Sequence, residues 1–277
     1  MRSAITLISR PFRDPARLLI IAAVLRSTLG WAQEQSLEDQ TLQQQGLTRA
    51  QAGWSVTLGA GVAAAPRYPG ASRERPRPIP LIAIDYDDRL IIGPAGIGLI
   101  AVHWQDFRSG PVLGFEGGRR ASDDPRLTGL GDISATATAG LFAAYDRGPI
   151  AITATARQAI SHTGNGFSGL LQIEVHHLIG RARIALGPDL EFGNNSYQQT
   201  WFGITPAQSA ASGLREYTPQ AGINRVGVHA VLTYRASAHV LWRVFARVSD
   251  LTGDAAESPI VERRMQYVIG AGIACHF

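Results

Sequence analysis

The chain has 277 residues, of which 17% are charged and 30 are glycine, and its mean hydropathy of +0.01 is low for a bundle of membrane helices. One domain of this composition fits a transmembrane β-barrel or a water-soluble β-sandwich. Every basic residue is arginine; five of the 26 arginines and one of the 22 acidic residues precede position 33, leaving 21 of each beyond it. Because a nucleic-acid binder needs a basic surface, this balance argues against nucleic acid as a partner. The single cysteine, Cys275, excludes an intramolecular disulfide and a cysteine metal cluster.

The N-terminus has the order of features that is typical of an export signal. Three arginines ending at Arg17 precede the apolar run 18–25, and small residues follow up to Ala32. The run is far shorter than the roughly 20 apolar residues that a membrane-spanning helix needs. We therefore expect residues 1–32 to be a signal peptide cleaved after Ala32, with an uncleaved anchor as the rival interpretation. The Gln-rich segment 33–52 is expected to be a flexible periplasmic lead-in.

From Trp54 onward, apolar residues recur with a period of two. The clearest case is the C-terminus, where one face of the predicted strand carries Met265, Tyr267, Ile269, Ala271, Ile273, Cys275 and Phe277. Runs of ten residues or more suit tilted strands that cross a bilayer, whereas sandwich strands usually stop at five or six. We predict an all-β fold over residues 53–277, an antiparallel transmembrane β-barrel of twelve strands, with ten strands as the alternative.

The connections between the predicted strands alternate between long and short, as they do in bacterial outer-membrane barrels. The predicted strands are 53–63, 78–87, 89–94, 96–105, 111–119, 132–146, 149–161, 168–178, 181–192, 222–236, 238–249 and 263–277. With a periplasmic N-terminus, the long connections face outward and Phe277 lies in the periplasm.

The sequence of the connections and their flanks resembles the MltA-interacting protein (MipA/OmpV) family. The resemblance is carried by ordered blocks: Pro66-x-Tyr68-Pro69-Gly70-x-Ser72, Pro78-x-Pro80, Asp87-x-Arg89, Gly118-Arg119-Arg120-x-Ser122-Asp123-Asp124, Leu127-x-Gly129-Leu130-x-Asp132, His162-x-Gly164, Phe202-Gly203-Ile204-Thr205, Ser212-Gly213-Leu214, Tyr217-x-Pro219-x-Ala221-Gly222 and Ser258-Pro259-Ile260-Val261. The blocks run in order from about residue 53 to the end of the chain.

This resemblance implies a place in the outer membrane of a Gram-negative cell, in contact with lipid and lipopolysaccharide and inserted by the barrel assembly machinery. It also implies a noncatalytic scaffold that links a lytic transglycosylase to a penicillin-binding protein during murein remodelling. Other members of the family are described as porin-like or as adhesins. The family supplies no accepted catalytic residues, and we expect no cofactor.

Charged residues at inward positions of the predicted strands form the candidate site. Such charges must be paired or hydrated inside a barrel. The candidate lumen network comprises Glu116, Arg157, Glu174, His176, Arg183, Arg225, Arg235, Arg243 and Arg247. Two interpretations stay open, a salt-bridged plug that makes the barrel rigid and a selectivity lining for an anion-leaning, small-solute channel.

A third class of function, an outer-membrane lipid enzyme, depends on Glu174 and His176 with Ser161, His162 or Ser168 nearby. A hydrolytic site needs nucleophile and base within hydrogen-bonding reach, which sequence does not show. We favour no catalytic residue and no metal site, because the acidic loop residues match no EF-hand spacing.

Two further segments carry expectations. The long connection 193–221 is rich in aromatic residues, which suggests a loop that folds into the barrel mouth, offers a contact surface or packs on itself. The terminal Phe277 closes an unbroken alternation and resembles the signal by which barrels are recognised for insertion.

Overall fold

The structure, a computed structural model, describes residues 53–93 and 96–277. The expected signal peptide 1–32 and lead-in 33–52 lie outside the described residues. None of the described helices is both long and apolar enough to cross a bilayer.

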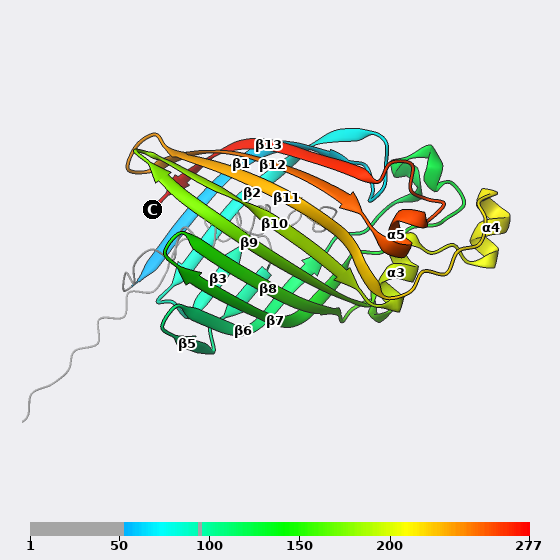
Figure 1. The fold of residues 1–277 in the computed structure, drawn as a ribbon, viewed down its shortest axis with the longest axis horizontal. Helices are drawn as coiled ribbons and strands as arrows, with labels where there is room; N and C mark the ends of the chain where they lie inside the picture. The colour runs from blue at the N-terminus through cyan, green and yellow to red at the C-terminus, as the bar shows by residue number, and fades with distance from the viewer. Residues whose placement is uncertain (1–52, 94–95) are drawn as a thin grey trace, which may run out of the picture.

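The strands form one antiparallel barrel (Figure 1). In chain order they are β1 (Trp54–Pro66), β2 (Glu74–Tyr86), β3 (Leu90–Gly93), β4 (Gly96–Leu99), β5 (Val102–Trp104), β6 (Phe107–Glu116), β7 (Thr136–Arg147), β8 (Ile150–Ala159), β9 (Phe167–Ile179), β10 (Ala182–Gly193), β11 (Gly222–Arg235), β12 (Val240–Leu251) and β13 (Met265–His276).

Pairing between the strands closes the sheet into a barrel. Strand β1 pairs with β13, and β4 pairs with β6, so the described strands form a closed ring. Strands β4 and β5 both pair with β6 and are two pieces of one position in the wall. The prediction of twelve strands is therefore confirmed, with the expected strand 96–105 interrupted at residues 100–101.

The alternation read from the sequence sorts side chains between the interior and the outer surface. On β13 the side chains of Tyr267, Ile269 and Ile273 are exposed outside the barrel, whereas Gln266 and Ala274 are buried inside it. Successive side chains of a strand point to opposite faces, so a period of two gives one apolar and one interior face. The outer surface is the apolar band that a barrel in a bilayer requires.

The two ends of the barrel differ. The short turns and the C-terminus share one end, named here the turn end, and the long connections gather at the other, the loop end (Figure 1). The loop end carries the helices η1 (Ala121–Asp123), η2 (Pro125–Leu127), η3 (Thr163–Asn165), α3 (Asn195–Phe202), α4 (Pro206–Ser212) and α5 (Gly253–Glu257). This is the expected alternation of short periplasmic turns and long outer loops.

Several strand boundaries at the loop end differ from the prediction, and those of β1, β2 and β7 are among the largest differences. Strands β1 and β2 extend to Pro66 and from Glu74, because their ladder continues through the proline-rich stretch that sequence reading treated as a loop. Strand β7 begins at Thr136 rather than at 132. Ile133 instead forms an isolated bridge with Arg119 and packs beside a cluster of loop side chains.

The lipid-facing assignment generates a prediction for two neighbouring residues of β9. Ile173 lies on the outer surface and Gln172 is buried inside the barrel opposite Asp189. We expect Ile173→Arg to cost about 2–4 kcal/mol near the bilayer midplane. Gln172→Arg places the same charge beside carboxylates and should cost less. The measurement is the folded yield in lipid vesicles, read as the band that shifts on heating; equal yields would contradict the assignment of faces.

Candidate functional site

The interior of the barrel contains a chain of charged side chains from four adjacent strands. Glu174 on β9, Asp189 on β10, His229 on β11 and Arg247 on β12 are all at most 4% exposed. They meet because each occupies an inward position, and because His229 and Arg247 are direct cross-strand partners. Gly227, the cross-strand partner of Asp189, has no side chain to displace its carboxylate. We name these four residues the lumen tetrad.

His229 joins the two carboxylates of the lumen tetrad. Its Nε2 lies 2.9 Å from Glu174 Oε1, and its Nδ1 lies 3.2 Å from Asp189 Oδ2. Arg247 donates to the other oxygen of Asp189. Both ring nitrogens can donate only when the imidazole carries two protons. The arrangement then balances two cations against two carboxylates within a buried space.

A second group around Glu191 lies on the same strand, two residues from Asp189. Arg225 pairs with Glu191, the amide of Asn224 donates to it over 3.1 Å, and the hydroxyl of Tyr197 donates over 2.8 Å. Burial and the neighbouring carboxylate of Glu191 raise the pKa of Tyr197 well above its ordinary value, so this hydroxyl stays a donor. Tyr197 comes from α3, so this group fastens a loop helix to the barrel interior.

The long connection 193–221 folds over the barrel mouth. Asn194 caps α3 by accepting from the amide of Tyr197 at 2.9 Å. The buried side chains of Tyr197, Trp201 and Phe202 pack with Leu251 of β12 and with two alanines of α5. Helix α4, in contrast, buries none of its residues and projects from the loop end (Figure 1). Of the three possibilities that the sequence raised for this loop, α3 matches the first, a loop that folds into the barrel mouth.

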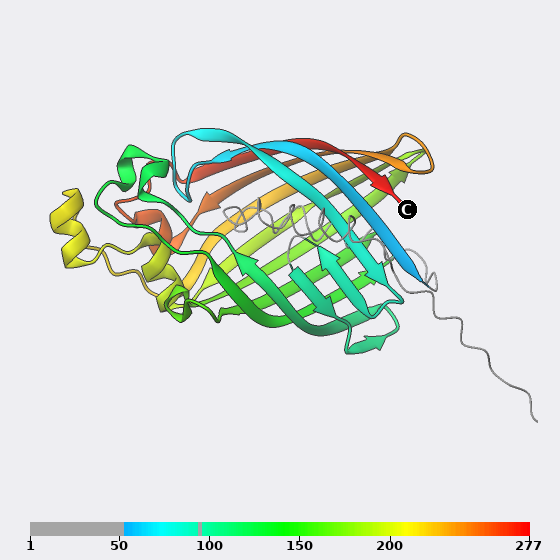
Figure 2. The ribbon, with the colours of Figure 1, turned by 180° about the vertical axis from the view of Figure 1, so that it is seen from behind.

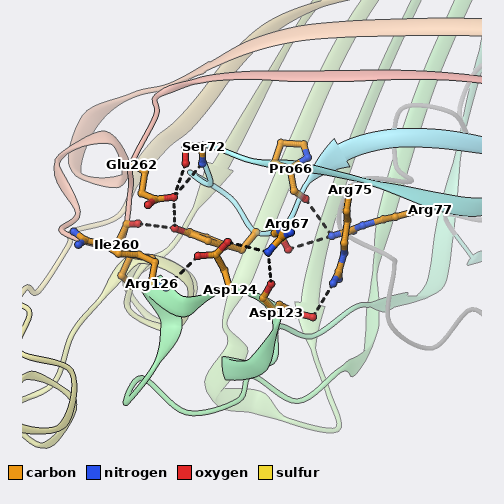
Figure 3. A network of polar contacts seen from close by, with 11 residues as sticks. Pro66, Arg67, Ser72, Arg75, Arg77, Asp123, Asp124, Arg126, Ile260 and Glu262 are labelled. Atoms are coloured by element: carbon orange, nitrogen blue, oxygen red, sulfur yellow. Dashed lines mark hydrogen bonds and ion pairs between the residues drawn. The ribbon is translucent and has the colours of Figure 1, made fainter.

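The remaining outer connections form a cap over the loop end, named here the outer cap. Its apolar core consists of Tyr68, Ala71, Leu127, Leu130, Ile204 and Ile260. Figure 3 shows how polar contacts join the connection after β1, the segment after β6 and the segment before β13. The Tyr68 hydroxyl donates to Glu262 at 3.2 Å, and Ser72 donates to the same carboxylate from both its amide and its hydroxyl.

Ion pairs attach the outer cap to the rim of the barrel. Arg67 lies 3.4 Å from Asp124, and Arg75 of β2 lies 2.8 Å from Asp123. Partial burial opposes ionisation of Asp123, but the amide of Arg120 and the Arg75 guanidinium outweigh it and lower the pKa of Asp123. Burial likewise opposes ionisation of Glu262, and the hydrogen bonds from Ser72 and Tyr68 lower the pKa of Glu262. Both carboxylates are therefore charged partners at neutral pH.

The structure brings together some of the residues in the candidate lumen network. Glu174 and Arg247 belong to the lumen tetrad, and Arg225 belongs to the Glu191 group. Glu116 and Arg157 share a cavity of about 60 Å³ with Tyr197. The other members lie apart from these groups. The side chain of Arg243 is buried nearer the turn end of β12 than Arg247, and His176 and Arg183 also lie toward the turn end. Arg235 is exposed at that end.

Two central residues, Asp189 and His229, were missed as network members. The signal was present in the sequence, because Asp189 has the same inward parity as Glu191 two positions later. His229 was not included in the candidate network, since only the register of the neighbouring strands places it between Glu174 and Asp189.

The side chains considered for lipid hydrolysis do not form one site. Glu174 of β9 is the cross-strand partner of Ala151, which lies near the turn end of β8. Ser161, in contrast, follows the loop end of β8. Ser161 contacts Thr136 at 3.0 Å and His162 at 3.5 Å. Among residues 53–93 and 96–277, no group of three or more His, Cys, Asp or Glu side chains is arranged to hold a metal ion. His229 separates its two carboxylates rather than converging with them on one point.

Comparisons with known proteins place the chain among outer-membrane proteins. The family model described as MltA-interacting protein MipA matches residues 58–277. A putative outer membrane protein, YiaT of Escherichia coli strain K12, is 25% identical over 159 residues, which cover 56% of this chain and 63% of that protein. The match thus spans less than two thirds of the relative's length.

Two solved barrels are similar in shape. The COG4313 outer membrane channel of Pseudomonas putida F1 is 10% identical with a TM-score of 0.45, covering 83% of this chain and 97% of that one. OmpT of Vibrio cholerae is 8% identical with a TM-score of 0.38, covering 82% and 100%. At these identities and scores the likeness says nothing about what this chain binds.

The lumen tetrad generates a prediction about stability. Asp189→Ala leaves His229 and Arg247 as like charges in a buried space, which should cost about 3–5 kcal/mol. The matched control is Asp106→Ala at the turn end, where the half-exposed carboxylate lies 3.9 Å from Arg147 and the pair contributes about 0–1 kcal/mol. Urea unfolding of the refolded barrel, followed by tryptophan fluorescence, measures both. Similar losses in the two variants would mean that the tetrad does not stabilise the barrel.

Proposed function

Because the chain belongs to the MltA-interacting protein MipA family and forms an outer-membrane barrel, we propose that it is a closed, noncatalytic anchor for a murein-remodelling enzyme. The observation that supports this proposal is the pairing of interior charges across strands in the lumen tetrad and the Glu191 group, which also joins α3 to the barrel interior. A solute channel needs a hydrated path along its lumen, whereas these groups use interior charge to bind strand to strand. The family description names a lytic transglycosylase, MltA, as the partner of the protein from which the family takes its name.

The turn end is the surface on which such a partner would bind. Murein lies on the periplasmic side of the outer membrane, and the short turns face that side in the orientation expected for bacterial barrels. The turns carry charges that reach solvent, among them the half-buried Asp88 and the exposed Asp106. Small rigid turns on a stable barrel offer a fixed platform, because little conformational entropy is lost when they are bound. A penicillin-binding protein would be a second partner on the same assembly.

An anion-leaning channel is the second candidate function. It is supported by the arginine-rich lining of a cavity beneath the outer cap, which contains six arginines and one carboxylate. Two of these arginines, Arg67 and Arg75, make the ion pairs that attach the cap, and two others, Arg225 and Arg247, pair with carboxylates inside the barrel, so we rank this candidate below the anchor.

The anchor proposal predicts that a lytic transglycosylase binds the turn end. The barrel, immobilised in a nanodisc, should bind the enzyme, and the double variant Asp88→Lys and Asp106→Lys should weaken binding at least tenfold by reversing two contact charges. Surface plasmon resonance measures the affinity.

The matched control reverses two exposed charges at the loop end, Glu216→Lys and Glu257→Lys, and should leave the affinity unchanged. Absence of binding by the unmodified barrel, or weakening by the loop-end variant alone, would contradict the anchor proposal.

A further inference from the structure

One side of the barrel wall is short. Strand β2 pairs with β1 along all 13 of its residues, but it pairs with β3 only from Ile84 to Tyr86. Strands β3 and β4 are each four residues long and form a short hairpin between β2 and β6, near the turn end (Figure 2). Within the part of the chain that the structure describes, no strand pairs with that edge of β2 from Glu74 to Ala83. We name this interval, between the edge of β2 and the end of β6, the wall gap.

The hydrogen-bond pattern identifies which β2 residues face the wall gap. The amide of Asp87 donates to the carbonyl of Gly53 over 3.3 Å, so odd-numbered β2 residues point their backbone groups toward β1. The amide of Arg89 donates to the carbonyl of Tyr86 over 2.8 Å on the opposite side. Backbone groups alternate along a strand, so even-numbered residues of β2 point toward β3 and, beyond it, toward the wall gap.

Proline occupies three successive positions of this edge. Pro76, Pro78 and Pro80 are the even-numbered residues that precede Ile82, and proline has no N–H group. A sheet edge in hydrocarbon is costly because each unsatisfied backbone group costs several kcal/mol. The prolines remove three donors from this edge, while the odd-numbered residues between them keep their pairing with β1. The carbonyls of these prolines still face the gap, so the sequence lowers the cost of an open edge in lipid without removing it.

The same prolines decide what can occupy the wall gap. An added strand from another chain binds through main-chain hydrogen bonds to an edge, and three missing donors prevent a regular ladder. The outward side chains here are the rings of the three prolines, of which Pro76 and Pro78 are exposed. An apolar chain that needs no hydrogen bonds suits this surface better than a peptide does.

An arginine-lined cavity lies directly inside the wall gap. Arg75 and Arg77 enter it from β2, and Gly118 and Arg119 enter it from the segment that follows β6, so its walls are the two sides of the gap. Its volume of about 40 Å³ has room for roughly three waters, which is the size of an ionic head group rather than of an acyl chain. In total six arginines and one carboxylate, Asp123, line it.

Four of the six arginines already pair with carboxylates: Arg67 with Asp124, Arg75 with Asp123, Arg225 with Glu191 and Arg247 with Asp189. The six guanidinium groups of the lining exceed these four carboxylates by two, and this excess of positive charge favours an anion. Arg119 is 3% exposed and donates to the carbonyl of Trp201 at 3.3 Å. Burial lowers the pKa of Arg119 to about 10, although the attraction of Tyr68, Asp123 and Asp132 opposes this shift. Arg119 is therefore still a cation at neutral pH, in a place where burial disfavours its charge. Arg77 donates to the carbonyls of Pro66 and Arg67, both at 3.1 Å, which holds its guanidinium at the cavity wall. A phosphate or carboxylate accepts from such planar guanidinium groups in pairs of parallel hydrogen bonds.

We propose that the wall gap is a lateral binding site for an anionic amphiphile of the membrane. The phosphate or carboxylate head enters the arginine-lined cavity, and the acyl chain stays in the bilayer against the proline edge of β2. This site is separate from the turn end, and its occupation does not depend on binding of a transglycosylase.

The test uses a dodecyl phosphate that carries a diazirine at the end of its chain, with the refolded barrel in neutral dodecyl maltoside. After illumination, labelled peptides are mapped by mass spectrometry. We expect labelling to concentrate on residues 74–83 and to fall at least tenfold when unlabelled dodecyl phosphate competes. Inorganic phosphate at the same concentration should compete weakly, because it lacks the chain.

The variant Arg77→Gln should reduce the labelling of residues 74–83 at least tenfold, and Arg235→Gln at the turn end is the matched control that should not. Unheated gel mobility verifies that each variant is folded; if Arg77→Gln fails to fold, the competition on the unmodified barrel still decides. Labelling spread evenly over the outer surface would show ordinary detergent contact and overturn the proposal. Equal competition by inorganic phosphate would replace the amphiphile with a free anion, and full labelling of folded Arg77→Gln would exclude the arginine cavity.

Discussion

Charges that point into a narrow barrel have no bulk water around them, and each therefore needs an opposite charge or a hydrogen bond. In this chain the requirement is met across strands: His229 joins Glu174 to Asp189, Asp189 joins His229 to Arg247, and Glu191 joins Arg225 to Tyr197 of α3. These contacts connect four neighbouring strands and a loop helix. Because removal of one charge leaves its partner buried without an opposite charge, the arrangement is stable only when it is complete.

The packing of the loop end depends on these interior contacts, and the barrel wall is shorter on one side. Tyr197 ties α3 to the barrel interior, and the outer cap then packs above it through Tyr68, Ile204 and Ile260. On one side, however, the short β3–β4 hairpin leaves the proline edge of β2 beside an arginine-lined cavity. The barrel wall is thus shortest on the side where the arginine-lined cavity lies.

Side-chain alternation and the lengths of the connections together predicted twelve antiparallel strands. Alternation alone predicted the lipid face, because in a barrel each residue has only two orientations, as Ile269 and Gln266 show. Partners inside the lumen depend on register as well, and register is set by turns and bulges that alternation does not reveal. This is why Asp189 and His229 were missed, and why Arg235 was included although it lies exposed at the turn end. Of the three prolines at the open edge of β2, only Pro76 was left outside the predicted strand 78–87. The pairing pattern, not the sequence, shows that the missing donors face an edge.

The central claim is that paired charges and α3 fill the lumen. Planar-bilayer recording of the refolded barrel tests it most directly, because current depends on a continuous hydrated path and on nothing else in the account. The account predicts that the inserted barrel gives no discrete conductance steps at neutral pH. Stable single-channel steps from the unmodified protein, reproduced in preparations whose unheated gel mobility shows a folded barrel, would contradict it.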